Sequence, residues 1–465
     1  MIGLGVMGRN FLLNVAENGF KCVGYDLDGE KVSALNSEGA EFDVHGVNSL
    51  SEFLESLEAP RKIMLLVPAG KIVDAVISDL LPHLDKGDLV IDGGNSHFSD
   101  TERREKDLTE RGFEFLGVGV SGGEEGARHG ASIMIGGNVD SYKKVEPVLK
   151  AVSAKVNGEP CAAHVGNSSA GHFVKMVHNG IEYGLMQMIC EAYDLLKNGF
   201  GLGNIEIADL FGEWNSAELN SFLMEITETV LRKKDDETGD FLTEKILDTA
   251  GQKGTGKWTS QAAMDFGVPI PTIDSAVTMR QISAMKALRV SISENLQLTG
   301  GKALDQSSRD GAIKSLRNGL YLAFIMSYAQ GLSLLKAASE EKSYELDFVE
   351  IAKIWRGGCI IRAALLEDIR KAFSDKPELE NLLLAENLRT RIQENRSSLK
   401  DTIANFVSAE IPCLAFSSTL NYLRSFASAR LPANILQAQR DFFGAHTYQR
   451  LDKAGTFHTP DWDRN

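Results

Sequence analysis

Four polar side chains near the middle of the chain have types and spacing that suit acid–base chemistry. They are Lys175, His178, Asn179 and Glu182. Their spacing of i, i+3, i+4 and i+7 places all four on one face of a helix. A solvated face is the ordinary explanation of such a stripe. The rest of this segment is largely apolar, however, which is more typical of a buried helix. We therefore predict a catalytic helix whose amine, imidazole, amide and carboxylate line a pocket.

This helix is expected to run without interruption from residue 168 to residue 199. Ser168 and Ser169 are candidate N-caps, the segment contains no proline, and Gly199 is suited to end the helix. A larger fold must position it.

Composition limits what that fold can be. A chain of 465 residues is too long for one ordinary core, so two or three domains are expected. The net charge of −15 argues against nucleic acid and anionic membranes as partners. No apolar run approaches the length of a membrane span, and the N-terminus lacks a signal-peptide pattern. The five cysteines are scattered without a CxxC pair, which argues against a metal cage and favours the reducing cytoplasm.

Residues 1–168 alternate short β-rich runs with helical segments, which predicts a parallel α/β layer structure. The expected strands are 21–26, 63–67, 89–92, 113–120 and 131–135.

A glycine-rich turn at the start of the chain predicts a Rossmann-type dinucleotide site. Its GxGxxG pattern comprises Gly3, Leu4, Gly5, Val6, Met7 and Gly8. Asp26 ends the second expected strand about 20 residues later, as the dinucleotide fingerprint requires. A pyrophosphate can then approach the N-terminus of the following helix. Only Met1 and Ile2 precede Gly3, where a full strand should stand, so the natural protein is expected to have several more residues before Met1.

Two further glycine-rich turns follow expected strands. DGGNS brings Asn95 to a strand's carboxyl end, where ligands bind in open α/β sheets. In VSGGEEGA, Ser121 and the N–H groups of Gly122 and Gly123 could hold a carboxylate. For each turn alone, an ordinary turn without a ligand is an equally good explanation.

The loop GQKGTGKW resembles the phosphate loop of nucleotide hydrolases. Trp258 stands where Ser or Thr must hold magnesium, and no strand precedes the loop, so we exclude an NTPase. Lys253 and Lys257 remain candidate anion ligands, with a solvated loop as the alternative. Arg280 is a further candidate, because an unpaired charge on its otherwise apolar helix would be costly.

Residues 169–428 are predicted to be a large all-helical domain with an internal duplication. The segment 174–197 aligns without gaps to 313–336. In the second copy, Arg317 and Tyr321 replace the His and Glu of the stripe. The chemistry is therefore placed in the first copy.

The last section, residues 429–465, is too apolar for a disordered tail and too short for a domain. We expect it to pack on a partner subunit. Arg440 and His446 in this tail are candidate site residues.

Together these motifs resemble those of the 6-phosphogluconate dehydrogenase family, decarboxylating. The resemblance covers essentially the whole chain and rests on GLGVMGRN, IDGGNS, VSGGEEGAR, GHFVKMVHNGIEYG, GQKGTGKWT, WRGGCIIR and QAQRDFFGAHTY. It implies a Rossmann-type domain, a duplicated helical domain, and a tail that completes the partner's active site in a homodimer. It also implies oxidation of 6-phosphogluconate at C3, loss of CO₂, and release of ribulose 5-phosphate in the pentose phosphate pathway.

The resemblance implies a role for each motif residue. Lys175 would be the general base and then the acid, and Glu182 the acid that protonates the enediol. The substrate carboxylate would be held by Ser121, Gly122, Gly123 and His178. Its hydroxyls would be bound by Asn95 and Asn179. Its phosphate would be bound by Tyr183, Lys253 and Arg280, and by Arg440 from the neighbouring subunit with His446 beside it.

The expected cofactor is NAD, with NADP possible. The family usually has Asn-Arg-Ser/Thr after the second strand, where this chain has Asp26, Leu27 and Asp28. An acid there accepts hydrogen bonds from ribose hydroxyls and repels a 2′-phosphate, and Leu27 removes the arginine that would bind it. Lys31 could support weak NADP binding. The alternative is that the two aspartates merely form a turn, and that cofactor choice is set elsewhere.

The other implied cofactor contacts are Val67, Pro68, Ala69 and Asn95, and no metal is expected. Pro68 stands where the family often has lysine.

Two other functions are weighed against this one. A non-decarboxylating β-hydroxyacid dehydrogenase shares the cofactor domain and a catalytic lysine, but it would not need the duplicated helical domain or the Arg440 tail. A non-enzymatic dinucleotide sensor would need neither Lys175 nor Glu182.

Overall fold

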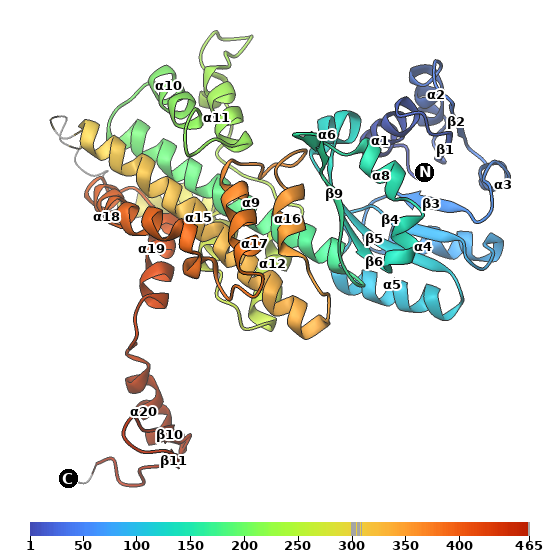
Figure 1. The fold of residues 1–465 in the computed structure, drawn as a ribbon. Helices are drawn as coiled ribbons and strands as arrows, with labels where there is room; N and C mark the ends of the chain where they lie inside the picture. The colour runs from blue at the N-terminus through green and yellow to red at the C-terminus, as the bar shows by residue number, and fades with distance from the viewer. Residues whose placement is uncertain (299–303, 305–306, 308, 464–465) are drawn as a thin grey trace.

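The computed structural model describes residues 1–298, 304, 307 and 309–463. An N-terminal α/β part and a helical part lie side by side, and the end of the chain extends away from both (Figure 1). We keep 1–168, 169–428 and 429–465 as the proposed domain bounds.

The α/β part is built on a sheet in the order β2–β1–β3–β4–β5–β6–β9. Ile2 joins β1 to β3 by parallel bridges to Tyr25 and Leu65. The strands are β1 (Cys22–Tyr25), β2 (Val44–Val47), β3 (Lys62–Leu65), β4 (Leu89–Asp92), β5 (Glu114–Ser121), β6 (Ser132–Gly137) and β9 (Ala162–Gly166), together with the hairpin of β7 (Lys155–Val156) and β8 (Glu159–Pro160).

The prediction of a parallel sheet is wrong at one position. β1 and β2 pair parallel, as do β3, β4 and β5, but β6 pairs antiparallel with β5. Only the short α6 (Gly123–His129) connects β5 to β6. A parallel crossover needs a connection of about a dozen residues or more, so this short one returns the chain in the opposite direction.

Helices cover both faces of the sheet. They are α1 (Val6–Glu17), α2 (Gly29–Glu38), α3 (Leu50–Glu55), α4 (Lys71–Leu80), the 3₁₀ turn η1 (Leu81–His83), α5 (Phe98–Glu110), α6, α7 (Val139–Lys143) and α8 (Glu146–Val152). Successive strand residues point to opposite faces. On β3, Met64 therefore packs in one core with α1 and α2, while Ile63 and Leu65 pack in another with α3 and α4.

The helical part is organised around two long helices, α9 and α15, which pack against each other. Its elements are α9 (Ala170–Asp194), the π-helical turn η2 (Leu195–Gly199), α10 (Asn204–Asn215), α11 (Phe222–Arg232), η3 (Leu242–Glu244), α12 (Thr255–Asp265), α13 (Pro271–Ala284), α14 (Lys286–Leu296), α15 (Arg309–Lys342), α16 (Phe348–Ile354), α17 (Leu365–Asp375), η5 (Leu382–Leu384), α18 (Glu386–Ser408) and α19 (Leu414–Phe426).

The predicted duplication is visible in this order, because α9 to α13 recur as α15 to α19. Each copy caps a helix of the other. On α9, Glu191 accepts hydrogen bonds from the N–H groups of Ala415 (2.9 Å) and Phe416 (3.0 Å) at the start of α19. On α15, the equivalent Gln330 accepts one from the N–H of Thr272 (2.9 Å) at the start of α13.

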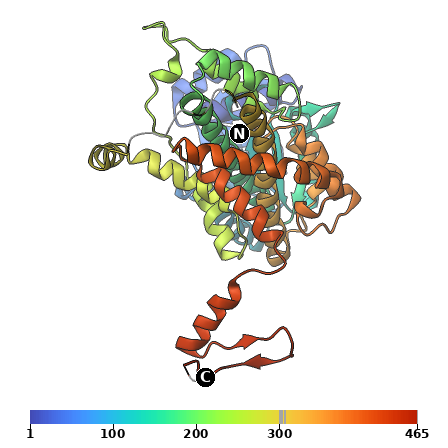
Figure 2. The same cartoon turned by 90° about the vertical axis from the view of Figure 1, so that its left-hand side faces the viewer.

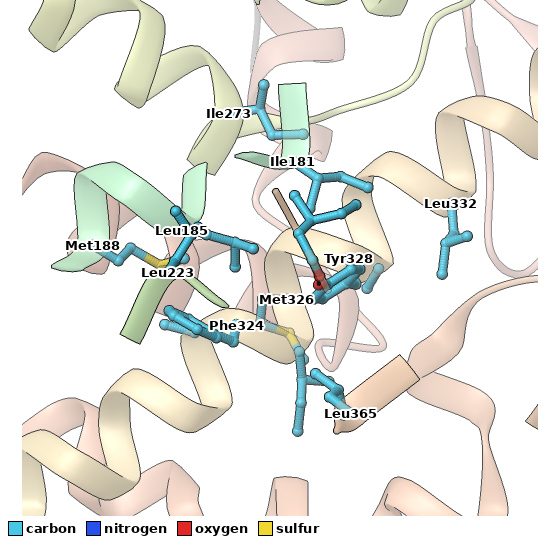
Figure 3. Packing of buried hydrophobic residues seen from close by; sticks show 14 of the residues in the cluster. Ile181, Leu185, Met188, Leu223, Ile273, Phe324, Met326, Tyr328, Leu332 and Leu365 are labelled. Carbon is cyan, nitrogen blue, oxygen red and sulfur yellow. Dashed lines mark hydrogen bonds between the residues drawn. The ribbon is translucent and has the colours of Figure 1, made fainter. Parts of the chain in front are cut away.

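The two copies share one hydrophobic core (Figure 3). Ile181 and Leu185 of α9, Phe324 and Tyr328 of α15, and Leu223 of α11 all belong to it. Contrary to the sequence analysis, α15 is long and apolar enough to span a membrane by length and composition. However, 83% of that stretch is buried inside the protein, as in a core helix.

The helix that is predicted to be catalytic, α9, begins and ends differently from the prediction. Ser169 is its N-cap but makes no side-chain capping bond. Its hydroxyl instead bonds to the Tyr344 hydroxyl at 2.7 Å and to the Glu102 carboxylate at 3.1 Å. Regular α-helix ends at Asp194, and the chain continues as a π-helical turn to Gly199.

The tail has a small fold of its own and projects away from the rest of the chain (Figures 1 and 2). It consists of α20 (Ala433–Gly444) and a hairpin of β10 (Tyr448–Gln449) and β11 (Thr456–Phe457). The buried carboxylate of Asp441 accepts hydrogen bonds from the N–H groups of Thr447 and Thr459 and from the Trp462 indole. Its exposed apolar residues include Ile435, Leu436, Phe442 and Phe443. The tail is therefore held together internally while its apolar surface stays uncovered.

The Glu191 cap predicts a pH dependence of stability. Burial outweighs the N–H donors and raises the pKa of Glu191 from 4.5 to about 7. The native state then holds this proton more tightly than the unfolded chain. The contribution to stability is present below pH 4.5 and is lost as the pH rises through about 7. The Tm of the wild type relative to Glu191→Gln should therefore fall across this window, as measured by thermal unfolding at a series of pH values.

Gln330→Glu is the matched control, because it places a carboxyl at the equivalent site and should introduce the same dependence. A wild-type Tm that stays level with, or rises against, that of Glu191→Gln over this window would contradict the prediction.

Candidate active site

A cleft of about 890 Å³ lies between the α/β part and the helical part. The α/β part contributes Met7, Leu66, Val67, Pro68, Ala69, Gly93, Gly94, Asn95 and Val120. The helical part contributes Asn179, Glu182, Tyr183, Gly251, Gln252, Lys253, Thr255, Trp258 and Arg280. The cleft therefore brings together the predicted cofactor loops, Asn179 and Glu182 of the polar stripe, and the candidate anion ligands. The prediction that all four stripe residues line a pocket is wrong for Lys175 and His178, which are buried behind the cleft wall.

Lys175 lies one turn before Asn179 on α9 and is 8% exposed. Its Nζ donates to Ser121 Oγ and to Asn179 Oδ1, both at 2.9 Å. Ser121 ends β5, so the amine is held where the sheet meets the helix. Both of these hydrogen-bond acceptors are uncharged.

The Lys175 amine and the Glu182 carboxyl are shifted toward their uncharged forms. Burial lowers the pKa of Lys175, against the attraction of the Glu182 carboxylate. Burial raises the pKa of Glu182, against the attraction of Lys175 and Arg280. An amine that can take a proton and a carboxyl that can give one are what general acid–base catalysis near neutral pH requires.

His178 extends this network as a neutral imidazole. Its pKa lies well below the usual value because it is fully buried and close to Lys175. Asn179 Oδ1 can only accept, so His178 Nδ1 donates to it at 3.1 Å. His178 Nε2 then accepts from the Ser121 hydroxyl at 3.3 Å. The Trp355 ring packs edge-on against the imidazole, with ring centres 5.7 Å apart.

Glycines allow α9 to lie close enough to the sheet for this network to form. A Cβ on Gly171 would lie 2.3 Å from the Gly117 carbonyl oxygen, and one on Gly119 would lie 2.5 Å from the Cβ of Lys175. Larger side chains at these positions would move Lys175 away from Ser121.

The Ser121 loop rests on the WRGGCIIR segment of the helical part. Gly122 has φ +117°, and a Cβ there would lie 2.5 Å from the carbonyl oxygen of Gly358. That same oxygen accepts a hydrogen bond from the N–H of Ser132 at 2.9 Å. Gly122 and Gly123 adjoin Ser121 at the start of α6, and carboxylate binding there stays a prediction.

One end of the cleft is suited to an anion. The Arg280 guanidinium lies 3.5 Å from the centre of the Tyr183 ring, and its Nη1 donates to the Gly251 carbonyl at 3.0 Å. Lys253 lines the same part of the cleft and is exposed. Two cations beside a phenol form a site that can hold a phosphate group.

The N-terminal loop fits a dinucleotide. A Cβ on Gly8 would lie 1.9 Å from the carbonyl oxygen of Gly3, whose φ is +95°, so the turn tolerates no side chain. The N-cap Gly5 has no capping side chain, which leaves the first N–H groups of α1 available to a pyrophosphate. Asp26 Oδ2 accepts a hydrogen bond from the N–H of Leu4 at 2.8 Å and so lies beside this loop.

The residues after Asp26 have different environments. Leu27 is 84% exposed. Asp28 caps α2 by accepting a hydrogen bond from the N–H of Glu30 at 3.0 Å, so it has the turn role named above as the alternative. Lys31 Nζ lies 3.5 Å from Asp26 and 3.6 Å from Asp28.

Thr255 and Trp258 were missed as site residues. Thr255 Oγ1 accepts a hydrogen bond from Asn179 Nδ2 at 3.2 Å. Trp258 packs edge-on against His97, at 5.0 Å between ring centres, and so links the helical part to the α/β part. Both residues belong to the GQKGTGKW motif, whose polar and aromatic side chains could have been predicted to line the site.

Arg104 was also missed, and it positions the loop that contains Asn95. It is 2% exposed, and its Nη1 donates to Asp92 Oδ2 and Ser96 Oγ, both at 3.1 Å. No local pattern in the sequence marks this contact.

Arg440 and His446 lie in the tail, and no tail residue lines the cleft among the residues described. Arg440 Nη1 donates to Gln437 at 3.1 Å within α20. Their assignment to a neighbouring subunit stays a prediction. The described part of the chain contains no group of three or more His, Cys, Asp or Glu side chains that could hold a metal.

Comparison with known proteins supports this arrangement. Residues 1–166 match the NAD binding domain of 6-phosphogluconate dehydrogenase, and residues 171–462 match the 6-phosphogluconate dehydrogenase C-terminal domain. The chain is 50% identical over 459 residues to the NADP(+)-dependent, decarboxylating 6-phosphogluconate dehydrogenase of Bacillus subtilis, covering 99% of this chain and 98% of that protein. It is 48% identical over 460 residues to the decarboxylating enzyme of Escherichia coli, with the same coverage.

A solved structure has the same fold over nearly the whole chain. The 6-phosphogluconate dehydrogenase of Plasmodium falciparum, studied as the apo form, with NADP+ and with 6-phosphogluconate, superposes with a TM-score of 0.96 at 43% identity and covers 99% of each chain. The chain therefore belongs to the 6-phosphogluconate dehydrogenase family.

Proposed function

We propose that this protein oxidises and decarboxylates 6-phosphogluconate to ribulose 5-phosphate and CO₂, passing a hydride to a nicotinamide cofactor. The observation that carries the proposal is the buried Lys175 amine, hydrogen-bonded to Ser121 and Asn179 beside a cleft with a dinucleotide loop and an anion site. The relatives named above carry out this reaction by name.

Lys175 acts first as a base. It takes the proton of the C3 hydroxyl while the hydride leaves C3 for the nicotinamide ring, which accepts it when bound. The product is a 3-keto acid whose carboxylate lies β to the new carbonyl. The N–H groups of Gly122 and Gly123 hold that carboxylate together with the Ser121 hydroxyl, which turns to it from His178 Nε2. Asn95 and Asn179 hold the hydroxyls.

Lys175 then acts as an acid. As CO₂ leaves, the electron pair of the broken bond forms the enediol, and Lys175 returns its proton to the C3 oxygen. Glu182 donates a proton to the carbon that lost CO₂. The hydroxyl on the former C3 then loses its proton, and this carbon becomes the C2 ketone of ribulose 5-phosphate. Tyr183, Lys253 and Arg280 keep the phosphate in place throughout.

A second copy of the chain completes the site in this proposal. The tail projects away from the rest of its own chain and exposes apolar side chains, which supports docking on a partner. Arg440 and His446 of the tail then reach the phosphate in the partner's cleft. The cytoplasm remains the predicted location.

Turnover with 6-phosphogluconate tests the reaction directly. The wild type should release CO₂ and reduced cofactor in equal amounts. Lys175→Met should lower kcat by about 10³-fold or more, because it removes the base while keeping a similar shape. Binding of 6-phosphogluconate should persist. Retention of a tenth of the activity would remove Lys175 from this role.

Glu182 acts late, so Glu182→Gln should lower turnover by about 10²-fold without loss of stability. A carboxylate that served only to pair with Lys175 would give the opposite result, a lower Tm with turnover largely kept. Kinetics and thermal melts on the same preparation separate the two roles.

We further propose that NAD is the preferred cofactor. The carboxylates of Asp26 and Asp28 lie near the loop, Lys31 is already paired to both, and Leu27 offers no donor to a 2′-phosphate. The named relatives do not support this preference, since one is NADP(+)-dependent and another was solved with NADP+.

The ratio of kcat/KM for the two cofactors decides the preference. NAD should have the higher value. The double variant Leu27→Arg with Asp28→Ser keeps a capping side chain on α2. It should shift the kcat/KM ratio toward NADP by about tenfold or more, because one charge-assisted hydrogen bond to the 2′-phosphate contributes roughly that factor. A wild-type advantage for NADP would overturn the proposal.

A further inference from the structure

The second copy of the duplicated unit repeats the local construction of the active site. In the first copy, Asn179 donates to Thr255 of α12 at 3.2 Å, and a Cβ on Gly180 would meet Thr259 of the same helix. In the second copy, Asn318 and Gly319 are the aligned residues. Asn318 donates to Ser398 of α18 at 3.5 Å, and a Cβ on Gly319 would meet Thr402. In both copies, the two partners on the facing helix are four positions apart.

A cavity of about 380 Å³ lies at this repeated place. Its polar lining consists of Glu218, Asn318, Tyr321, Asp368, Arg391 and Asn395. The apolar residues Ala364 and Leu365 at the start of α17 complete the wall. This volume is at the lower end for small-molecule sites, so a ligand of about five or six carbons fits it.

The groups needed for the dehydrogenase reaction are absent here. Lys314, which aligns with Lys175, is exposed. Arg317, which aligns with His178, is held by the carboxylate of Glu218 at 2.7 and 2.8 Å. Tyr321 replaces the catalytic Glu, so the cavity has neither a buried base nor a carboxyl acid at these positions.

The charge of the lining also argues against an anion. Glu218 and Asp368 are acidic, and the Arg391 guanidinium is paired with Asp368 and donates to the Tyr321 hydroxyl at 3.0 Å. The remaining N–H groups of Arg391 make no hydrogen bond within the described residues. Arg391 thus offers donors and Asn318, Asn395 and the carboxylates offer acceptors. Such a mixture suits hydroxyl groups, which both donate and accept.

We propose that this cavity binds an uncharged polyhydroxy compound, a sugar or polyol, as a second site separate from the active-site cleft. The duplication would then have kept the place of the substrate site while exchanging phosphate-binding chemistry for hydroxyl-binding chemistry.

The test uses ribitol, an uncharged five-carbon polyol, with the full-length protein. Its dissociation constant is measured by ligand-detected NMR with and without saturating 6-phosphogluconate. Wild-type protein should bind ribitol equally in both conditions. Asn395→Leu, which fills the cavity, should weaken binding at least tenfold while turnover is kept. Gln252→Leu, the equivalent change in the active-site cleft, should leave ribitol binding unchanged.

Asp368→Asn removes one carboxylate with little change in shape, and it should also weaken ribitol binding. If Asn395→Leu does not fold, this variant tests whether ribitol binds in the cavity. Absence of ribitol binding to the wild type would overturn the proposal. So would competition by 6-phosphogluconate, or loss of ribitol binding in Gln252→Leu rather than in the cavity variants.

Discussion

The desolvation of the Lys175 amine is the constraint on which the rest of the structure depends. A solvated lysine has a pKa of about 10.4 and would stay protonated near neutral pH. Here burial lowers that pKa, and the acceptors that hold the amine, Ser121 and Asn179, carry no charge. Glu182 and, less strongly, the Cys359 thiol oppose the lowering of the Lys175 pKa, and burial raises the pKa of Glu182 itself. One environment thus shifts both groups toward the uncharged forms that the proposed base and acid require.

The duplicated helical part provides this burial. α9 is enclosed between the sheet, where Gly119 and Gly171 permit close contact, and a core shared with α15. The Glu191 and Gln330 caps tie each copy to the other, so α9 cannot be displaced without disturbing both. A single helical unit would leave the side of α9 that faces α15 exposed to water.

The fold and site were predictable where the signal is local. Helical periodicity located the Lys175 stripe, and apolar runs bounded by turns located β1, β3, β4, β5 and β6. The antiparallel β6 was not predicted, because strand direction depends on the connection rather than on the strand. Thr255 and Arg104 were missed as site residues because their partners, Asn179 and Asp92, lie on other elements. The contact between Trp355 and His178 was not predicted, because the two residues are far apart in the sequence and meet only in the folded chain.

The most direct test of this account is the titration of Lys175 itself. Nitrogen-15 labelling of the lysine side chains, with the Lys175 signal assigned by its loss in Lys175→Met, gives the pKa by NMR in the full-length protein. The account predicts a pKa below that of an ordinary lysine, and a further decrease in Glu182→Gln because a carboxylate that favours the charged amine is removed. A Lys175 pKa at or above about 10.4 would contradict the claim that burial prepares this amine as a base.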